Sequence, residues 1–207
     1  MPFIRKTGDV SPPAAQDARL ILQALASPVS EDRWMAARAA TELEDADLAL
    51  SQALRTETDP RVREAMFTGL ARIGTPVAVE SLLSMLRSDS ASLRTGALDA
   101  LRMLRSLGAV ASQLLRDADP DIRILSCELA RSLPAAEASG LLCELLAGEQ
   151  NVNVCAAAIE VLAEVGGPEA LATLADCAGR FRSAAFLQFA ISAVRDRINV
   201  KSASTRD

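Results

Sequence analysis

Apolar side chains recur along this chain at intervals of three and four residues, the spacing that places them on one face of an α-helix. The segment TDPRVREAMFTGLARIG at 58–74 shows the pattern clearly. Its apolar stripe consists of Val62, Met66, Gly69, Leu70 and Ile73. These positions lie within about 100° of one another on a helix. The segment is therefore predicted to be a helix that buries one face.

Similar segments, most of them with an Arg near the start, recur about every 30 residues, a period typical of solenoid proteins. They lie at 30–43, 58–74, 88–104, 118–134 and 150–166. Shorter amphipathic helices are expected at about 14–26, 46–56, 77–87, 108–117, 135–147 and 168–179. A single pair of such helices cannot bury its own apolar face, so neighbouring pairs must stack on one another.

Turn residues separate the predicted helices. Asp59-Pro60 and Asp119-Pro120 each end one helix and open the next, while Gly74, Gly108 and Pro134 close helix pairs. The sequence thus predicts one repeat domain over 14–198, with tails at 1–13 and 199–207 that are expected to be mobile. The six repeats are expected at about 14–44, 45–74, 75–107, 108–134, 135–166 and 167–198. Phe181, Phe186 and Phe189 are expected to fill the last layer of the core.

The composition argues against several classes of function. The chain has no His, which removes Ser-His-Asp, Cys-His and His-based metal sites. A formal charge of −5 argues against nucleic acid as a ligand. The four Cys have no Cys-x-x-Cys pairing and are interpreted as buried apolar residues of a reducing compartment. No secretion signal or membrane span is recognisable, so a cytoplasmic protein without a metal, a cofactor or a membrane partner is expected.

The run Asp-Pro-x-[Val/Ile]-Arg, followed by small residues and a closing Leu, resembles the HEAT-repeat superfamily. Asp59, Pro60, Val62 and Arg63 carry this pattern, as do Asp119, Pro120, Ile122 and Arg123. The resemblance is greatest to the short bacterial repeats also seen in phycobilisome lyases. It implies an all-α fold, a right-handed α-α superhelix (solenoid) of about six HEAT-like helix pairs, similar to armadillo proteins. HEAT arrays serve many unrelated tasks, so this fold alone does not assign a function.

The resemblance also implies a structural ladder of arginines that bind aspartates in the turns between helices. The arginines are Arg33, Arg63, Arg94 and Arg123, and the aspartates are Asp59, Asp89 and Asp119. Such charge-assisted bonds suit the planar guanidinium group. An anion-binding role for the same arginines remains the alternative.

In HEAT-like arrays the second helix of each pair lines a concave groove, and the residues on that side are candidates for partner binding. They are Trp34, Arg38, Phe67, Leu98, Asp99, Arg102, Ile124, Glu128, Arg131 and Glu160, with Ile159 completing an apolar floor. Protein interfaces are enriched in aromatic residues and arginine beside apolar surface. The alternative for Trp34 and Phe67 is packing between repeats. Region 117–176 has eleven acidic residues and two arginines, which is either an interface for a basic segment or a solvated surface.

No set of residues with catalytic spacing is evident, so the chain is expected not to be an enzyme. The leading hypothesis is a non-catalytic scaffold or adaptor that holds another protein or a peptide in the groove. We expect a monomer or a weak homodimer. The first alternative is a chromophore (bilin) lyase or its accessory subunit, on the strength of the family resemblance alone. The second is a HEAT-like DNA-binding or repair protein, which would need a more basic and aromatic groove.

Overall fold

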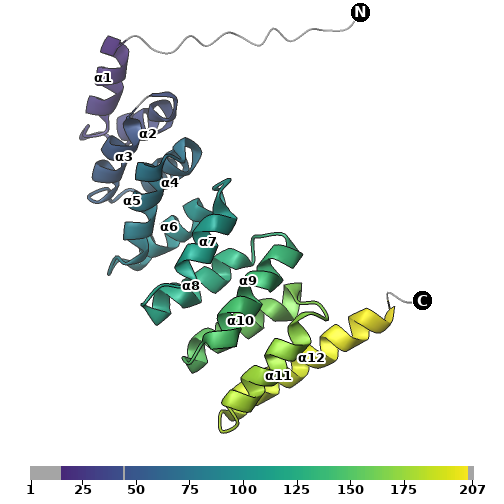
Figure 1. Ribbon diagram of the computed structural model, residues 1–207. Coiled ribbons are helices and arrows are strands. Elements are labelled where there is room, and N and C mark those ends of the chain that lie inside the picture. Colours follow the sequence, from purple (N-terminus) through teal and green to yellow (C-terminus); the bar gives the residue numbers. More distant parts are fainter. Residues whose placement is uncertain (1–14, 44, 205–207) are drawn as a thin grey trace, which may run out of the picture. The chain divides into compact units, whose positions relative to one another are not determined.

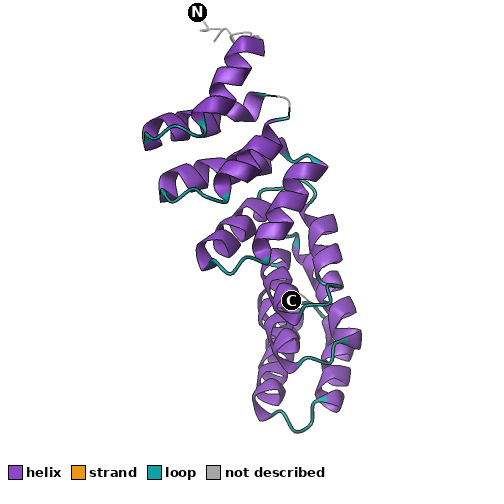
Figure 2. Cartoon of the chain, turned by 90° about the vertical axis from the view of Figure 1, so that its left-hand side faces the viewer, coloured by secondary structure: helices purple, strands orange, loops and turns teal. Residues whose placement is uncertain are grey.

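The computed structural model describes residues 15–43 and 45–204, and these are helical apart from short turns and loops (Figures 1 and 2). Twelve α-helices and one short 3-10 helix follow one another within the described ranges, which contain no strand. The chain divides into two units at the end of α6, between Ala100 and Leu101. The expected all-α fold of paired helices is confirmed.

The first unit contains three helix pairs. Its elements are α1 (Ala15–Ala24), α2 (Ser30–Ala39), η1 (Ala40–Glu42), α3 (Ala46–Leu54), α4 (Pro60–Ile73), α5 (Pro76–Leu86) and α6 (Ala91–Arg102), whose last two residues belong to the second unit. Within this unit α2 packs on α4 and α3 packs on α5. Second helices therefore stack on second helices and first helices on first helices, as a repeat array requires.

The second unit follows the same plan. Its helices are α7 (Leu107–Leu114), α8 (Pro120–Ala130), α9 (Ala135–Gly148), α10 (Val152–Val165), α11 (Ala170–Arg180) and α12 (Ala185–Ser204). Helix α10 packs between α8 and α12, and α9 packs on α11. Helix α12 continues to Ser204, beyond residue 198 where the last repeat was expected to end. The expected tail at 1–13 lies outside the described residues.

Local capping explains where the helices begin and end. Asp59 accepts hydrogen bonds from the backbone amides of Arg61 and Val62, and Pro60 occupies the first turn of α4. Proline has no amide hydrogen to leave unsatisfied at that position. At the other end of α4, Gly74 adopts a left-handed conformation with φ of 60°, which suits a residue without a Cβ atom.

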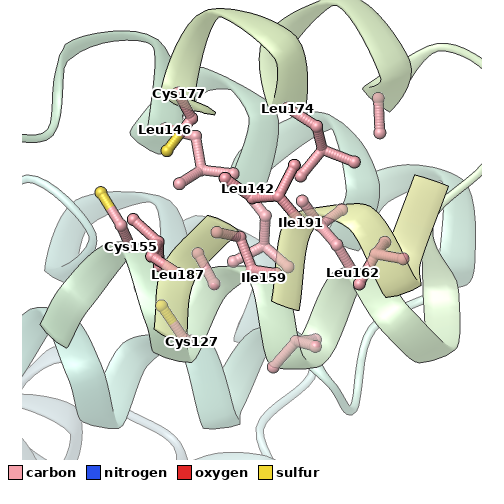
Figure 3. Close-up of a cluster of buried hydrophobic side chains, with 14 of the residues drawn as sticks. Cys127, Leu142, Leu146, Cys155, Ile159, Leu162, Leu174, Cys177, Leu187 and Ile191 are labelled. Carbon is pink, nitrogen blue, oxygen red and sulfur yellow. The ribbon is translucent and has the colours of Figure 1, made fainter. Parts of the chain in front are cut away.

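The core of the second unit is a continuous layer of aliphatic and cysteine side chains (Figure 3). Leu142 and Leu146 of α9, Leu162 of α10 and Leu174 of α11 have no exposed surface. Helix α12 completes this layer with the residues of its inner face, which are Leu187, Ile191, Val194 and Ile198. Each fully buried Leu contributes roughly 2–5 kcal/mol, judged by the usual cost of its replacement by Ala.

The prediction that three phenylalanines fill the last layer is wrong for two of them. The side chains of Phe186 and Phe189 lie on the other side of α12 and are 55% and 77% exposed. Only Phe181 packs against the core. The reason is that α12 has apolar residues on two faces, and the aliphatic face supplies the buried one.

Candidate functional site

Five of the six turns that lead into a second helix, those before α2, α4, α6, α8 and α10, are built around the side chain two residues before the helix cap. In these five turns this side chain accepts a hydrogen bond from the amide of the capping residue. The acceptors are Ser27, Glu57, Ser88, Asp117 and Glu149. Sequence reasoning missed this role, although the recurrence of Ser, Asp or Glu at that position was a usable signal.

Two of the predicted ladder arginines join neighbouring repeats through these acceptors. Arg33 forms two hydrogen bonds of 2.6 and 2.9 Å with the Glu57 carboxylate, and its third nitrogen donates to the carbonyl oxygen of Ser27. Arg123 binds Glu149 in the same two-pronged way at 2.7 and 3.1 Å. Each arginine thus fixes its own turn and the turn of the next repeat.

The other two arginines make fewer bonds. Arg94 donates to the backbone carbonyls of Ser88 and Asp89, and Arg63 reaches the Ser92 hydroxyl at 3.4 Å. Ser88 occupies the acceptor position in the turn that follows Arg63, so this position offers no carboxylate for a two-pronged ion pair.

The expectation that the ladder arginines bind the side chains of turn aspartates is therefore corrected. The carboxylates of Asp59 and Asp119 cap α4 and α8 by accepting backbone amides, and Asp89 contributes its carbonyl oxygen. A cap carboxylate that points along its own helix cannot also face the arginine of the preceding repeat. At this turn Glu57, two positions before Asp59, binds the arginine of the preceding repeat instead.

The ion pairs shift the pKa values of both carboxylates. Hydrogen bonds from Arg33 lower the pKa of Glu57, against the effect of its burial. Burial raises the pKa of Glu149, but the Arg123 guanidinium and two backbone amides lower it further, so the net change is downward. Both groups are therefore held as carboxylates, which keeps the rungs intact at neutral pH.

The structure contradicts part of the predicted groove. Phe67 is only 6% exposed, and Ile159 only 1%. The Phe67 ring packs against Gly96 of α6, where an added Cβ atom would lie 2.2 Å from a ring carbon. Ile159 belongs to the core of the second unit. Both residues pack between helices, so neither can form part of a binding surface.

Trp34 of α2 remains a surface residue and is the centre of the candidate site. It is half-buried, with the Arg61 guanidinium 3.9 Å and the Arg38 guanidinium 4.7 Å from its ring centroid. Arg61 also pairs with the exposed Glu31 at 2.8 Å. Stacked cations of this kind fix the orientation of an aromatic ring. The side chain is thus presented in a defined position.

Trp34 lines a surface hollow of about 420 Å³, formed mainly by residues of α2 and α4. We call it the Trp34 hollow. Its lining residues are Trp34, Arg38, Thr41, Arg61, Glu64, Ala65, Thr68, Gly69 and Arg72. Three arginines and one glutamate face it, so its lining is cationic. The arrangement offers an aromatic surface and guanidinium donors, which are the groups that protein interfaces favour.

In the second unit, the predicted residues Glu128, Arg131 and Glu160 come together. Arg131 forms ion pairs with Glu128 of α8 and with Glu160 and Glu164 of α10. Its Nε atom is buried and has no hydrogen-bond partner among the described residues. Three carboxylates surround one cation, so this part of the acidic region 117–176 has an excess of negative charge.

The remaining predicted residues lie on α6 and α8. Leu98, Arg102 and Ile124 are half-buried, and Asp99 is exposed. These burial states leave all four side chains partly accessible. Their role in partner binding stays a prediction.

A larger hollow of about 490 Å³, which sequence reasoning did not anticipate, lies between α1 and α3. Leu22, Leu25 and Gln52 line it, and the Arg33–Glu57 ion pair forms one wall. Its charged side chains are already paired with each other. The Trp34 hollow, by contrast, contains Arg38, which forms no ion pair within the described ranges. We therefore take the Trp34 hollow as the candidate site.

The cysteines are free thiols, and three of the four are buried. Burial raises the pKa of Cys127 to about 12 and also raises that of Cys143. A hydrogen bond with Cys155 lowers the pKa of Cys177 to about 7. The cysteines are thus part of the core, as predicted. The described residues include no cluster of acidic, Cys or His side chains suited to a metal ion.

Antiparallel helix pairs that stack in register, with an arginine at most turns, define a helical repeat protein of the solenoid class. A family profile of HEAT repeats matches residues 18–102 and 108–195. The chain belongs to the HEAT repeat family. Among curated proteins, none matches it. None of the helices in the described ranges combines the length and apolar character needed to cross a bilayer.

Three of the solved structures that match this chain are the following. The Escherichia coli protein YibA is 16% identical, with 90% of this chain and 82% of that chain covered and a TM-score of 0.42. A designed armadillo repeat protein in complex with peptide (KR)4 is 15% identical, with 88% and 99% covered and a TM-score of 0.42. The complex of CpcE and CpcF of phycocyanin lyase from Nostoc is 17% identical, with 95% and 100% covered and a TM-score of 0.40.

Proposed function

We propose that this protein is a non-catalytic adaptor that holds a segment of another protein in the Trp34 hollow. The observation that carries the proposal is the half-buried Trp34 ring, which has two guanidinium groups 3.9 and 4.7 Å from its centroid and lines a hollow of about 420 Å³. Aromatic and arginine side chains in such a setting are the residues that dominate binding energy at protein interfaces.

The chemistry of the hollow indicates what kind of segment it accepts. An apolar side chain of the partner would cover the Trp34 ring, and one or two carboxylates beside it would meet Arg38 and Arg72. Arg72 is partly neutralised by the exposed Glu42 at 3.2 Å, whereas Arg38 forms no ion pair with any residue that the structure describes. Exposed charge pairs contribute little to stability, so Arg72 can exchange its partner at low cost. An acidic peptide or helix with one large apolar residue fits best.

The proposal is tested by affinity capture, mass spectrometry and reconstitution with the purified partner. The double variant Trp34→Ala with Arg38→Glu should lower the affinity for that partner at least about tenfold, the loss of one interface anchor. The helical circular dichroism should be unchanged. Met35→Ala with Arg55→Glu is the matched control, because both residues are exposed and lie outside the hollow. If the partner binds the double variant as tightly as wild type, the site is assigned wrongly.

Trp34 also provides a direct signal, because it is the only tryptophan in the chain. Binding at the hollow should change its fluorescence emission when a tryptophan-free partner segment is titrated in. Titration without any change would place the contact elsewhere. The bilin-lyase and DNA-binding alternatives stay predictions, to be tested by mixing the protein with a bilin and by a gel shift at low salt.

A further inference from the structure

Helix α12 has a second face that does not belong to the core. Its inner face packs on α10 and α11. The opposite side exposes side chains at alternating intervals of three and four residues. These are Phe186, Phe189, Ala193, Asp196 and Val200, which we call the outer stripe. A 3-4-3-4 spacing is the pattern by which one helix packs along another.

The outer stripe is strongly apolar at its start. Phe186 and Phe189 are two of the five phenylalanines in the chain, and they are 55% and 77% exposed. Val200, near the other end of the stripe, is 67% exposed. Exposure of several large apolar side chains along one face of a helix is typical of an interaction site.

We propose that the outer stripe binds the outer stripe of a second copy of this chain, with the two α12 helices antiparallel and crossing at Ala193. The stripe is self-complementary in that arrangement, because its aromatic half meets the half that carries Asp196 and Val200, with the exposed Arg197 beside them. Alanine at the crossing point lets the helices approach closely. A two-fold pairing of one surface with itself is the commonest form of protein dimer.

Charge selects the antiparallel direction. In a parallel pair, Arg197 would lie beside Arg197 of the other copy and Asp196 beside its equivalent, so like charges would repel. In the antiparallel pair, Arg197 lies opposite Phe189, where a guanidinium can stack on the ring. The two Arg197 side chains are then about 12 Å apart along the helix axis, at 1.5 Å per residue. Solvent ions screen most of the repulsion at that distance.

The same geometry limits the strength of the dimer. One helix crossing buries less than the 1,200 Å² or so typical of a stable complex. The dimer should therefore form reversibly as concentration increases. This inference does not depend on the Trp34 hollow, which lies in the other unit.

Sedimentation velocity of the full chain, from about 5 µM to about 500 µM, measures the self-association. Wild type should shift from monomer towards dimer over this range. Phe189→Asp should remain monomeric with unchanged helical circular dichroism. Val77→Asp is the control, since Val77 is an exposed apolar residue on α5, outside the outer stripe, and its change should leave the dimer intact. A wild-type chain that stays monomeric, or a Phe189→Asp variant that still dimerises, overturns the proposal.

Cysteine substitutions test the direction of pairing. Ala193→Cys should give a disulfide-linked dimer on mild oxidation, because the two-fold axis brings the residue 193 positions together. Phe186→Cys is the control on the same stripe. In the antiparallel pair its two copies lie about 21 Å apart, too far for a disulfide. A linked Phe186→Cys dimer, or no link through residue 193 above the wild-type background, contradicts the proposed arrangement.

Discussion

The ion pair between Arg123 and Glu149 is the place where a single substitution should reveal how the repeats hold together. Glu149→Ala removes both guanidinium hydrogen bonds and leaves the amides of Gln150 and Asn151 without their acceptor. Exposed ion pairs contribute roughly 0–1 kcal/mol, whereas breaking a buried pair costs about 3–5 kcal/mol. The two side chains are 16% and 6% exposed. We therefore expect a loss of about 2–3 kcal/mol in the free energy of unfolding.

Urea unfolding followed by circular dichroism measures this loss. The matched control is Glu144→Ala, which breaks the Arg116–Glu144 pair of the same unit, whose side chains are 65% and 66% exposed. It should change the free energy of unfolding by less than about 1 kcal/mol. A double-mutant cycle that combines Glu149→Ala with Arg123→Met measures the interaction free energy between the two side chains. Equal effects of the two glutamate substitutions, or no coupling to Arg123, would refute the reasoning that burial makes this rung strong.

Three further predictions concern the packing of Gly96, the titration of Glu149 and the accessibility of the thiols. Gly96→Ala should destabilise the first unit by about 1–3 kcal/mol in thermal unfolding, because the new methyl group meets the Phe67 ring; an unchanged midpoint would show that the ring moves freely. Since the pKa of Glu149 is lowered by folding, its contribution is present above the unfolded-state pKa of about 4.3 and is lost as pH falls through the folded value. The stability gap between wild type and Glu149→Gln should therefore be constant near neutral pH and shrink in acid. In native protein a thiol reagent should label Cys143 first, since the other thiols are buried, and rapid labelling of all four would contradict the packing.

The positions of the helices could be predicted from the sequence because local chemistry sets them. Asp59 with Pro60, and Asp119 with Pro120, start α4 and α8 where the capping pattern requires. Gly74 ends α4 because it accepts a left-handed conformation. These signals act within a few residues, so they do not depend on the rest of the fold.

The contacts between repeats were harder to predict, because they depend on which of two neighbouring residues points at the next helix pair. The ladder arginines were found, but the carboxylates that bind Arg33 and Arg123 are Glu57 and Glu149, each two positions before a helix cap, and not the expected aspartates. Phe67 and Ile159 were assigned to the surface from helix periodicity, yet a second helix packs on neighbours at both sides and buries more than one stripe. On α12 the apolar residues of the inner and outer faces have similar helical spacing, so the sequence pattern does not say which face is buried.

The position of a residue relative to the helix cap explains which of the predicted groove residues are exposed and which are buried. The eighth residue after the cap is buried in four of the five second helices that carry the motif. The ninth is exposed or half-buried in all five. These ninth residues are Arg38, Thr68, Asp99, Glu128 and Glu160. The fold therefore fixes a surface position and leaves its chemistry free to vary.

The charge of the residue at this ninth position changes sign along the chain. The position is cationic in α2, where Arg38 stacks on Trp34, and anionic in α8 and α10, where Glu128 and Glu160 surround Arg131. A segment that suits the first unit must supply carboxylates, whereas the second unit favours a segment that supplies cations. Charge reversal at Arg38 should therefore impair an acidic ligand of the first unit and leave a basic ligand of the second unaffected. Titration of each unit's ligand against the Arg38→Glu variant separates the two surfaces, and equal impairment of both ligands would show that they share one site.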